Sequence, residues 1–512
     1  MTATLPSLAP PATQRDDLGE FGYEQQLHRK LGSFASFAAG FSFISVLTTV
    51  FQLAGLGFSF GGPAFIWAWP LVLGGQLLVA LCFAELAARF PISGAIYQWT
   101  TRMSNSTYGW FAGWIMIVGQ TVVMTAAAIA LQVVLPSVWS GFQVIGDDPD
   151  ITSTSGAQNA MLLAGGLIVA TTVINIIGVR LMAVVNNVGV TCEIVGALVI
   201  IGLLLTHTNR GTEVVFDLGS VSSSGYFGAF LCASFTAAYV MIGFDSAGEL
   251  SEETRDARRV APRTMLRALL AAGLLGGALL MALLLAAPSL TDGRFASEGP
   301  AYVISALFTG LTGHVLLLMV AIAICVATLA VQTSGSRMLF SMARDGKMPL
   351  AKTLAHVPSS TGTPVYAATA IGLGAIGVLA LNLGPHSAFI NLESTCIALV
   401  YLAYLMLTTA MLVQRLRGNP LLAAHVVDEQ GAAVFSLGRW GLPVNVAAVL
   451  YGLAMLVNLA WPRQEIYDPE GGSWYMQYFA ILFTLGTAAV GVLLYWASQR
   501  RPEPVAEPVL AG

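Results

Sequence analysis

Carboxylate side chains lie inside long apolar stretches of this sequence. Glu193, Asp245 and Glu393 each stand well within such a stretch, and Glu85 lies at the end of another. A carboxylate is costly to place in a segment of membrane-spanning length, so it marks a candidate functional site. No Lys or Arg lies at a similar depth to neutralise the first three. They favour a proton, or a substrate with a cationic group, over a permanent ion pair, whereas for Glu85 we expect a structural pairing.

Small residues accompany one of these carboxylates and recur in the first apolar stretch. Gly243 and Gly248 flank Asp245 and could let a helix open there, which would free backbone groups to bind a ligand. The stretch 38–46 contains a glycine and two serines that could do the same. A tight contact between helices, made by the small residues, is the alternative in both places.

The composition indicates the class of protein. Of the 512 residues, 56% are hydrophobic and 10% are charged, whereas soluble proteins carry about 25% charged residues. We therefore expect an all-α integral membrane protein. The sequence has no basic tract for nucleic acid, no metal-ligand spacing and no catalytic constellation. We expect no nucleic-acid partner, no metal, no cofactor and no enzymatic activity.

Twelve apolar runs are long enough to cross a bilayer, for which a helix needs about 20 residues. If the N-terminus is cytoplasmic, Arg210, Arg294 and Arg463 fall in outer loops and the other 20 of the 23 basic residues lie inside. Because basic residues favour the cytoplasmic side, we expect a multi-pass protein of the plasma membrane with both termini cytoplasmic. The runs are 34–58, 64–89, 107–138, 159–179, 182–206, 225–249, 262–288, 303–343, 364–382, 386–414, 440–461 and 474–498. The eighth is too long for one span, so we expect a short outer helix followed by the span itself.

The first and sixth runs contain the two possible helix breaks. Two five-helix halves of opposite orientation, each opening with a broken helix, are typical of an inverted repeat that binds its substrate between the breaks. We expect the chain to divide into a tail at 1–33, a first repeat at 34–206, a second at 225–414, two further helices at 440–498 and a tail at 499–512.

Three stretches carry a family resemblance: FAELAARFPISGAIYQW at 83–99, GFDSAGELSEE at 243–253 and SRMLFSMARDGKMP at 336–349. Together they resemble the amino acid–polyamine–organocation superfamily of transporters. They are most similar to its amino acid/choline permease branch, whose members include permeases for γ-aminobutyrate and choline. The resemblance implies alternating access and the LeuT-type fold, with twelve transmembrane helices, ten of them in a five-plus-five inverted repeat. Ala95 departs from the second glycine that the superfamily often has there.

The resemblance also implies that the two breaks line the substrate pocket. Freed amides at the N-terminus of a half-helix suit a substrate carboxylate, whereas freed carbonyls suit an ammonium group, and an aromatic face attracts a cation. Lipid or core packing is the alternative for the aromatic residues. The expected substrate-binding residues are Gly40, Phe41, Ser42, Phe43, Ile44 and Ser45 in the first run, and Ile242, Gly243, Phe244, Asp245 and Ser246 in the sixth.

Four further residues are candidates for coupling or gating. Many superfamily members carry a Lys near the position of Glu193, so a lysine-based mechanism does not transfer, and Glu193 could carry the coupling proton itself. A neutral Glu that joins two helices is the alternative. Thr328 and Gln332 could face the first helix and help a pocket or cation site. Glu393 could form an outer gate or read a substrate amine, with a pairing at the interface as the alternative.

The sequence thus predicts a secondary transporter that imports a small amino acid or amine, such as γ-aminobutyrate, driven by protons or alternatively by sodium. A choline, ethanolamine or polyamine permease, or an amino acid exchanger, is the nearest alternative. A nutrient sensor of the same fold that binds without transport would be expected to carry a long cytoplasmic tail, and the expected tails are short.

Overall fold

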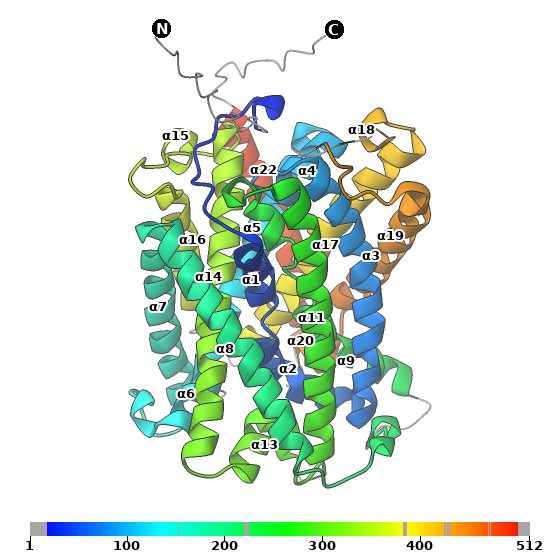
Figure 1. Ribbon diagram of the computed structural model, residues 1–512. Helices are drawn as coiled ribbons and strands as arrows, with labels where there is room; N and C mark the ends of the chain where they lie inside the picture. The colour runs from blue at the N-terminus through cyan, green and yellow to red at the C-terminus, as the bar shows by residue number, and fades with distance from the viewer. Residues whose placement is uncertain are drawn as a thin grey trace, which may run out of the picture.

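The computed structural model in Figure 1 is a bundle of helices that run roughly along one common direction. It describes residues 18–151, 153–219, 225–291, 293–381, 387–423, 426, 431–468, 471 and 473–499, with the backbone alone at 381, 387–394 and 499. These residues form helices and no β-strand, apart from an isolated bridge between Leu31 and Thr254. The expected all-α class is therefore confirmed for the described part of the chain.

The bundle is built from long helices joined by short ones. The longer helices are α1 Ser33–Ile44, α2 Val46–Gly61, α3 Ala68–Arg89, α4 Ala95–Met103, α5 Ser106–Ile129, α6 Leu131–Val138, α7 Thr154–Ile177, α8 Val179–Leu205, α9 Tyr226–Val240, α11 Ala257–Ala286, α13 Pro300–Leu307, α14 Leu311–Arg344, α16 Val365–Leu381, α17 Ser387–Leu416, α19 Gly441–Ala460 and α22 Phe479–Gln499. The shorter helices are η1 Gly19–Phe21, η2 Pro63–Trp67, η3 Ser140–Phe142, η4 Thr212–Phe216, α10 Ser246–Glu249, η5 Ser251–Glu253, α12 Arg294–Glu298, α15 Ala351–Leu354, α18 Pro420–Ala423, η6 Gly438–Trp440, α20 Gln464–Tyr467 and α21 Trp474–Gln477.

Ten helical stretches of the described chain are long and apolar enough to cross a membrane. The expected runs 225–249 and 364–382 fall instead on the shorter apolar helices α9 and α16. The expected division of the eighth run is confirmed, because α13 and α14 are separate helices. Large apolar side chains on the outer helices, such as Val169, Val188, Leu450 and Leu493, are about half exposed or more. Such faces suit lipid, as expected of a multi-pass membrane protein.

The helices that carry the candidate site lie at the centre of this bundle. The α1 helix packs on α8 and α11, and α2 packs on α9. The α14 helix crosses beside α5 and α8, and α17 lies against α5 and α19. Figure 1 shows α1 and α2 one above the other, enclosed by the longer helices. The residues next to the break, from Ala38 to Phe51, are therefore all buried against protein.

The two ends of the bundle carry different connections. One end, which we call the N-terminal end, holds η1, α4, α15 and α18, and the last turns of α22 also reach it (Figure 1). The opposite end holds α13. Residues 18–32 cross the N-terminal end and pair with the chain beyond η5, because the Leu31 amide donates to the Glu253 carbonyl (2.9 Å) and the Arg255 amide donates to the Leu31 carbonyl (3.0 Å).

Candidate functional site

The first long helix is broken at a single residue. The α1 helix ends at Ile44, α2 begins at Val46, and Ser45 between them has a φ of +39°. A left-handed backbone is unfavourable for a residue with a side chain, so neighbouring contacts must hold Ser45 there. The expected break therefore exists, but it is narrower than the stretch 40–45, which remains helical up to Ile44.

A second break separates α9 from α10. Residues 241–245 are not helical, and Gly243 has a φ of +89°, which glycine adopts without a steric penalty. The Gly243 amide, which has lost its place in a helix, donates to the phenol oxygen of Tyr404 on α17 (3.0 Å). The expected site residues Ile242, Phe244 and Asp245 lie in this break, and their side chains are buried.

The two breaks face one another in the middle of the bundle. A Cβ atom placed on Gly243 would lie 1.8 Å from Cδ1 of Phe43, so the Phe43 ring packs directly on that glycine. A Cβ atom placed on Gly40 would lie 3.5 Å from the carbonyl oxygen of Phe244 and 4.0 Å from Oγ of Ser246. The structure therefore brings together residues some 200 positions apart that the sequence assigned to one pocket. The remaining members, Phe41, Ser42 and Ile44, are buried in the last turns of α1.

Glu193 on α8 reaches the first break. Its Oε1 accepts hydrogen bonds from Ser45 Oγ (3.0 Å) and from the Leu47 amide (3.2 Å). The Val46 amide lies near the same carboxyl group. These amides are the first of α2, where the partial positive charge of a helix dipole favours an anion. Glu193 is fully buried, and its Oε2 has no hydrogen-bond partner in the described chain. The carboxyl group thus joins α8 to the start of α2.

The second break holds two carboxyl groups one helical turn apart. Tyr404 donates its phenol hydrogen to Oδ1 of Asp245, whereas Oδ2 of Asp245 has no partner among the described residues. Glu249 ends α10 and is fully buried. The Gly94 amide lies near its carboxyl group, but neither oxygen has a partner of good hydrogen-bond geometry in the described part of the chain. No basic side chain pairs with either group there, so both are exceptions to the rule that buried carboxyl groups are satisfied.

Three aromatic rings cluster beside Asp245. The rings of Phe83 and Tyr404 have centroids 4.9 Å apart, those of Phe244 and Tyr404 are 5.3 Å apart, and those of Phe83 and Phe244 are 5.6 Å apart. Such rings attract a cation placed over their faces. The break therefore combines aromatic faces with acceptor oxygens, a chemistry that suits a positively charged group.

The other expected coupling residues are placed differently. Thr328 lies buried on α14 and donates to the Ile324 carbonyl of its own helix (2.9 Å). Gln332 directs its amide nitrogen to Thr172 Oγ1 (2.6 Å) and to the Ala368 carbonyl (3.3 Å). These partners lie on α7 and α16, and the role of Gln332 in a pocket or cation site stays a prediction. Glu393 belongs to α17, but its side chain lies outside the described part.

Buried ion pairs lie between the breaks and the N-terminal end of the bundle. Arg337 pairs with Glu253 (2.9 Å) with both side chains fully buried, and Arg344 binds both carboxyl oxygens of Glu252 (2.8 and 2.9 Å). At the same end, Arg89 and Arg415 both pair with Glu85. The structural pairing expected for Glu85 is therefore confirmed. Each of these carboxylates has a cation, in contrast to those at the breaks.

Residues 18–32 make further contacts at the N-terminal end, beside these ion pairs. Tyr23 and Tyr97 donate to the two carboxyl oxygens of Asp345 (2.9 and 2.8 Å), and the Arg344 guanidinium lies 4.0 Å from the centre of the Tyr23 ring. Burial and then the nearby Asp345 charge raise the pKa of both Tyr23 and Tyr97. The two phenols therefore remain protonated and donate to Asp345 at neutral pH.

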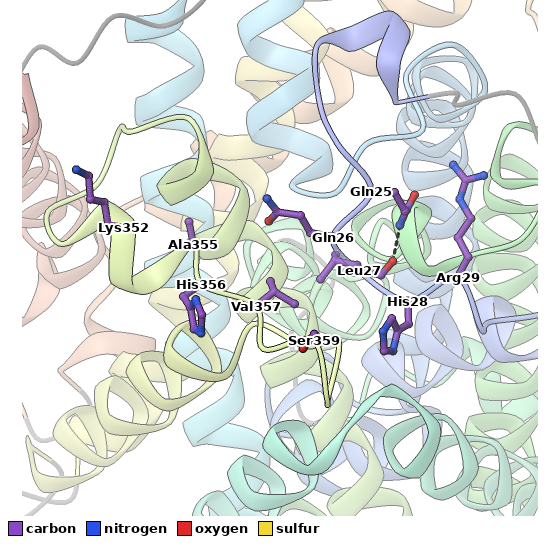
Figure 2. A pocket seen from close by; sticks show the side chains of 10 residues that line it. All are labelled: Gln25, Gln26, Leu27, His28, Arg29, Lys352, Ala355, His356, Val357 and Ser359. Atoms are coloured by element: carbon purple, nitrogen blue, oxygen red, sulfur yellow. Dashed lines mark hydrogen bonds between the residues drawn. The ribbon is translucent and has the colours of Figure 1, made fainter.

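A cleft of about 660 Å³ lies elsewhere, at the N-terminal end between residues 25–29 and the segment 352–359. Figure 2 shows Arg29 and Lys352 on opposite sides of the view, so the two basic side chains do not converge on one point. None of the expected site residues lines it. The cleft is therefore separate from the two helix breaks.

Sequence reasoning missed Glu249 and Tyr404 as parts of the site. Glu249 stands four residues after Asp245, the spacing that places two side chains on one face of a helix, and this signal could have revealed it. Tyr404 is one of several tyrosines in the apolar runs, and the sequence around it does not distinguish it from the others. Its contact with Asp245 depends on how α17 packs against the second break.

Comparison with known proteins identifies the family. A family model described as "Amino acid permease" matches residues 25–487. Relatives include the amino-acid permease BAT1 of Arabidopsis thaliana, 27% identical over 87% of this chain and 88% of its own length. The thiamine transporter thi9 of Schizosaccharomyces pombe is 24% identical over 88% of this chain and 81% of its own length, and the GABA-specific permease of Saccharomyces cerevisiae is 23% identical over 88% and 78%. These relatives are transporters rather than enzymes, and the chain belongs to the amino acid permease family.

Proposed function

We propose that this chain is a secondary active transporter for a small amine-bearing solute. The solute is either an amino acid such as γ-aminobutyrate or an amine such as choline, ethanolamine or a polyamine. The observation that carries the proposal is the meeting of two helix breaks around Asp245, a buried carboxyl group with no basic partner in the described chain. Relatives named for amino acids, γ-aminobutyrate and thiamine support both solute classes.

In this proposal the chain has the LeuT-type fold with twelve spans in an inverted repeat. The sixth span is α9 together with α10, and its break explains why neither half reaches spanning length. The ninth span is α16. The N-terminal end of the bundle faces the cytoplasm of the cell, so the ion pairs of Glu252 and Glu253 close the inner side, and opening them would begin the inward-facing half of an alternating-access cycle.

We further propose that protons drive uptake. The coupling group must gain and lose a proton within the cycle, and buried carboxyl groups can do so as their hydration changes. Glu193 and Asp245 are the candidates at the breaks. A sodium site formed by carbonyl groups of the first break together with Thr328 is the alternative.

Reconstitution of the full chain into lipid vesicles tests this function. With an imposed inward proton gradient, we expect the wild type to accumulate labelled γ-aminobutyrate, ethanolamine or choline against its concentration gradient. Glu193→Gln, which fixes a neutral side chain, is expected to abolish accumulation while exchange of solute across the membrane continues. If Glu193→Gln still accumulates solute, the proton is carried elsewhere, and Asp245 becomes the next candidate. If a sodium gradient drives the wild type and a proton gradient does not, proton coupling is wrong.

A second candidate function, an exchanger, makes a different prediction in the same vesicles. An exchanger would move labelled solute only when unlabelled solute is present on the other side, with or without an ion gradient. A sensor would bind solute in solution and show no movement in either experiment.

A further inference from the structure

The N-terminus of α2 already holds a carboxylate that belongs to the protein. A solute carboxylate bound at the first break would need the amides of Val46 and Leu47, because these are the first donors of the half-helix. Glu193 Oε1 already accepts from the Leu47 amide and from Ser45 Oγ, and the Val46 amide lies near the same carboxyl group. A second carboxylate would have to displace a tethered one, and then lie beside it in a buried site where like charges repel.

The second break offers acceptors and few free donors. Oδ2 of Asp245 and both carboxyl oxygens of Glu249 have no partner in the described chain. The hydroxyl groups of Ser246, at the start of α10, and of Ser42, in the last turns of α1, also lack a partner in the described chain, and all four side chains are buried. A hydroxyl group can donate or accept, but a carboxylate can only accept. A cationic amine would supply the missing donors and the compensating charge together.

We infer that the site selects small amines that carry no carboxylate group. Asp245 and Glu249 bind the ammonium group under the rings of Phe83, Phe244 and Tyr404, and Glu193 excludes solutes with a carboxylate by filling the position that such a group would take. The inference rests on the proposed transport function and narrows it to one of the two solute classes. It makes Glu193 a specificity-determining residue and Glu249 a binding residue.

Three matched pairs of solutes test this inference with the purified full chain. The pairs are ethanolamine and glycine, choline and glycine betaine, and putrescine and γ-aminobutyrate, and the second member of each carries a carboxylate. A ligand that binds only the folded protein raises the melting temperature by an amount that grows with the logarithm of its concentration divided by its Kd. For at least one pair, we expect the first member to bind at least about tenfold more tightly than the second, and its uptake into vesicles to show the same order.

Variants separate the two parts of the inference. Glu193→Gln is expected to reduce the preference within the pair by about tenfold or more, because the charge that repels a carboxylate is gone while an acceptor for α2 remains. Ser45→Ala removes one donor that holds Glu193 in place, and is expected to shift the preference in the same direction by a smaller factor. Glu249→Gln is expected to weaken the amine without favouring the carboxylated solute. Glu298→Gln, at an exposed pair with Arg294, serves as the matched control.

The outcomes are distinguishable. If the carboxylated member of every bound pair binds as tightly as its partner, the inference is wrong while the transport function stands. If Glu193→Gln and Ser45→Ala both fold and leave the preference unchanged, Glu193 is not the specificity residue. If the wild type neither binds nor moves any of the six solutes, the proposed function and the inference fail together.

Discussion

The two helix breaks treat their polar groups in different ways. At the first break, Oε1 of Glu193 accepts from Ser45 and from the amide of Leu47, whereas Oε2 of the same group has no partner in the described chain. At the second break, the Gly243 amide donates to Tyr404, but Oδ2 of Asp245 and both carboxyl oxygens of Glu249 have no partner in the described chain. The first break is mainly a joint between helices, which we call the closed joint, with one unpartnered carboxyl oxygen in the described chain, whereas the second break has three.

This difference shows that an interrupted membrane helix is not by itself a binding site. Buried polar groups in proteins are almost always hydrogen-bonded, so the groups left without partners indicate where a ligand belongs. The N-terminus of a half-helix would attract an anion if it were free, but here the protein supplies that anion. The distribution of unsatisfied groups therefore argues for a cation at the second break.

The largest expected effect is at Asp245. Asp245→Asn keeps the size of the side chain but removes the charge that we assign to solute binding, so uptake into vesicles should fall by at least about 100-fold, which corresponds to about 2.7 kcal/mol. The protein should remain folded, because no ion pair of Asp245 is lost. Size-exclusion profiles and melting temperature check the folding, and Asp147→Asn in an exposed loop is the matched control. Uptake at the normal rate would make Asp245 a packing residue.

A smaller effect is expected at Tyr404. Tyr404→Phe removes the donor to Asp245 and the acceptor of the Gly243 amide, leaving a buried amide unsatisfied at a cost of about 1–3 kcal/mol. We expect solute affinity to fall by about tenfold and the melting temperature to fall with it. Titration of solute against melting temperature measures both. An affinity that rises while stability falls would mean that Tyr404 competes with the solute for Asp245.

The smallest effect is expected at Ser45 and concerns the closed joint. Ser45→Gly loses a hydroxyl group but gains the freedom to adopt a positive φ, and these contributions are each about 1 kcal/mol and opposite in sign. Ser45→Ala loses the hydroxyl group and keeps the strain. The melting temperature of Ser45→Gly should therefore lie above that of Ser45→Ala and near the wild type. Equal melting temperatures for the two variants would show that the backbone at Ser45 is not strained.

The helical framework follows closely from the sequence because membrane spans have a simple physical signature. Long apolar runs predicted the positions of the helices, and the weak helix formers predicted both breaks, at Ser45 and around Gly243. The division of the eighth run into α13 and α14 followed from its length. These features depend on local composition, which a sequence displays directly.

The partners of the site residues could not be predicted in the same way. Glu193 contacts Ser45 across 148 positions of the chain, and Tyr404 contacts Asp245 across 159. Such contacts depend on the rotation of each helix about its own axis. Gln332 illustrates this limit, since a helix that passes the site can still turn a polar side chain toward α7 and α16.

The contacts of residues 18–32 bear on how fast the N-terminal end opens in the proposed transport cycle. Their contacts with Glu253, Asp345 and Arg344 are several and separate, and each net hydrogen bond is worth about 1 kcal/mol. In the proposed cycle, any motion that separates residues 18–32 from η5 and from the end of α14 must break these contacts in turn, so the activation barrier would be a sum of small contributions rather than one large one. A change at Tyr23 would therefore alter how often this end opens by a modest factor, and leave the affinity for solute to the residues of the breaks.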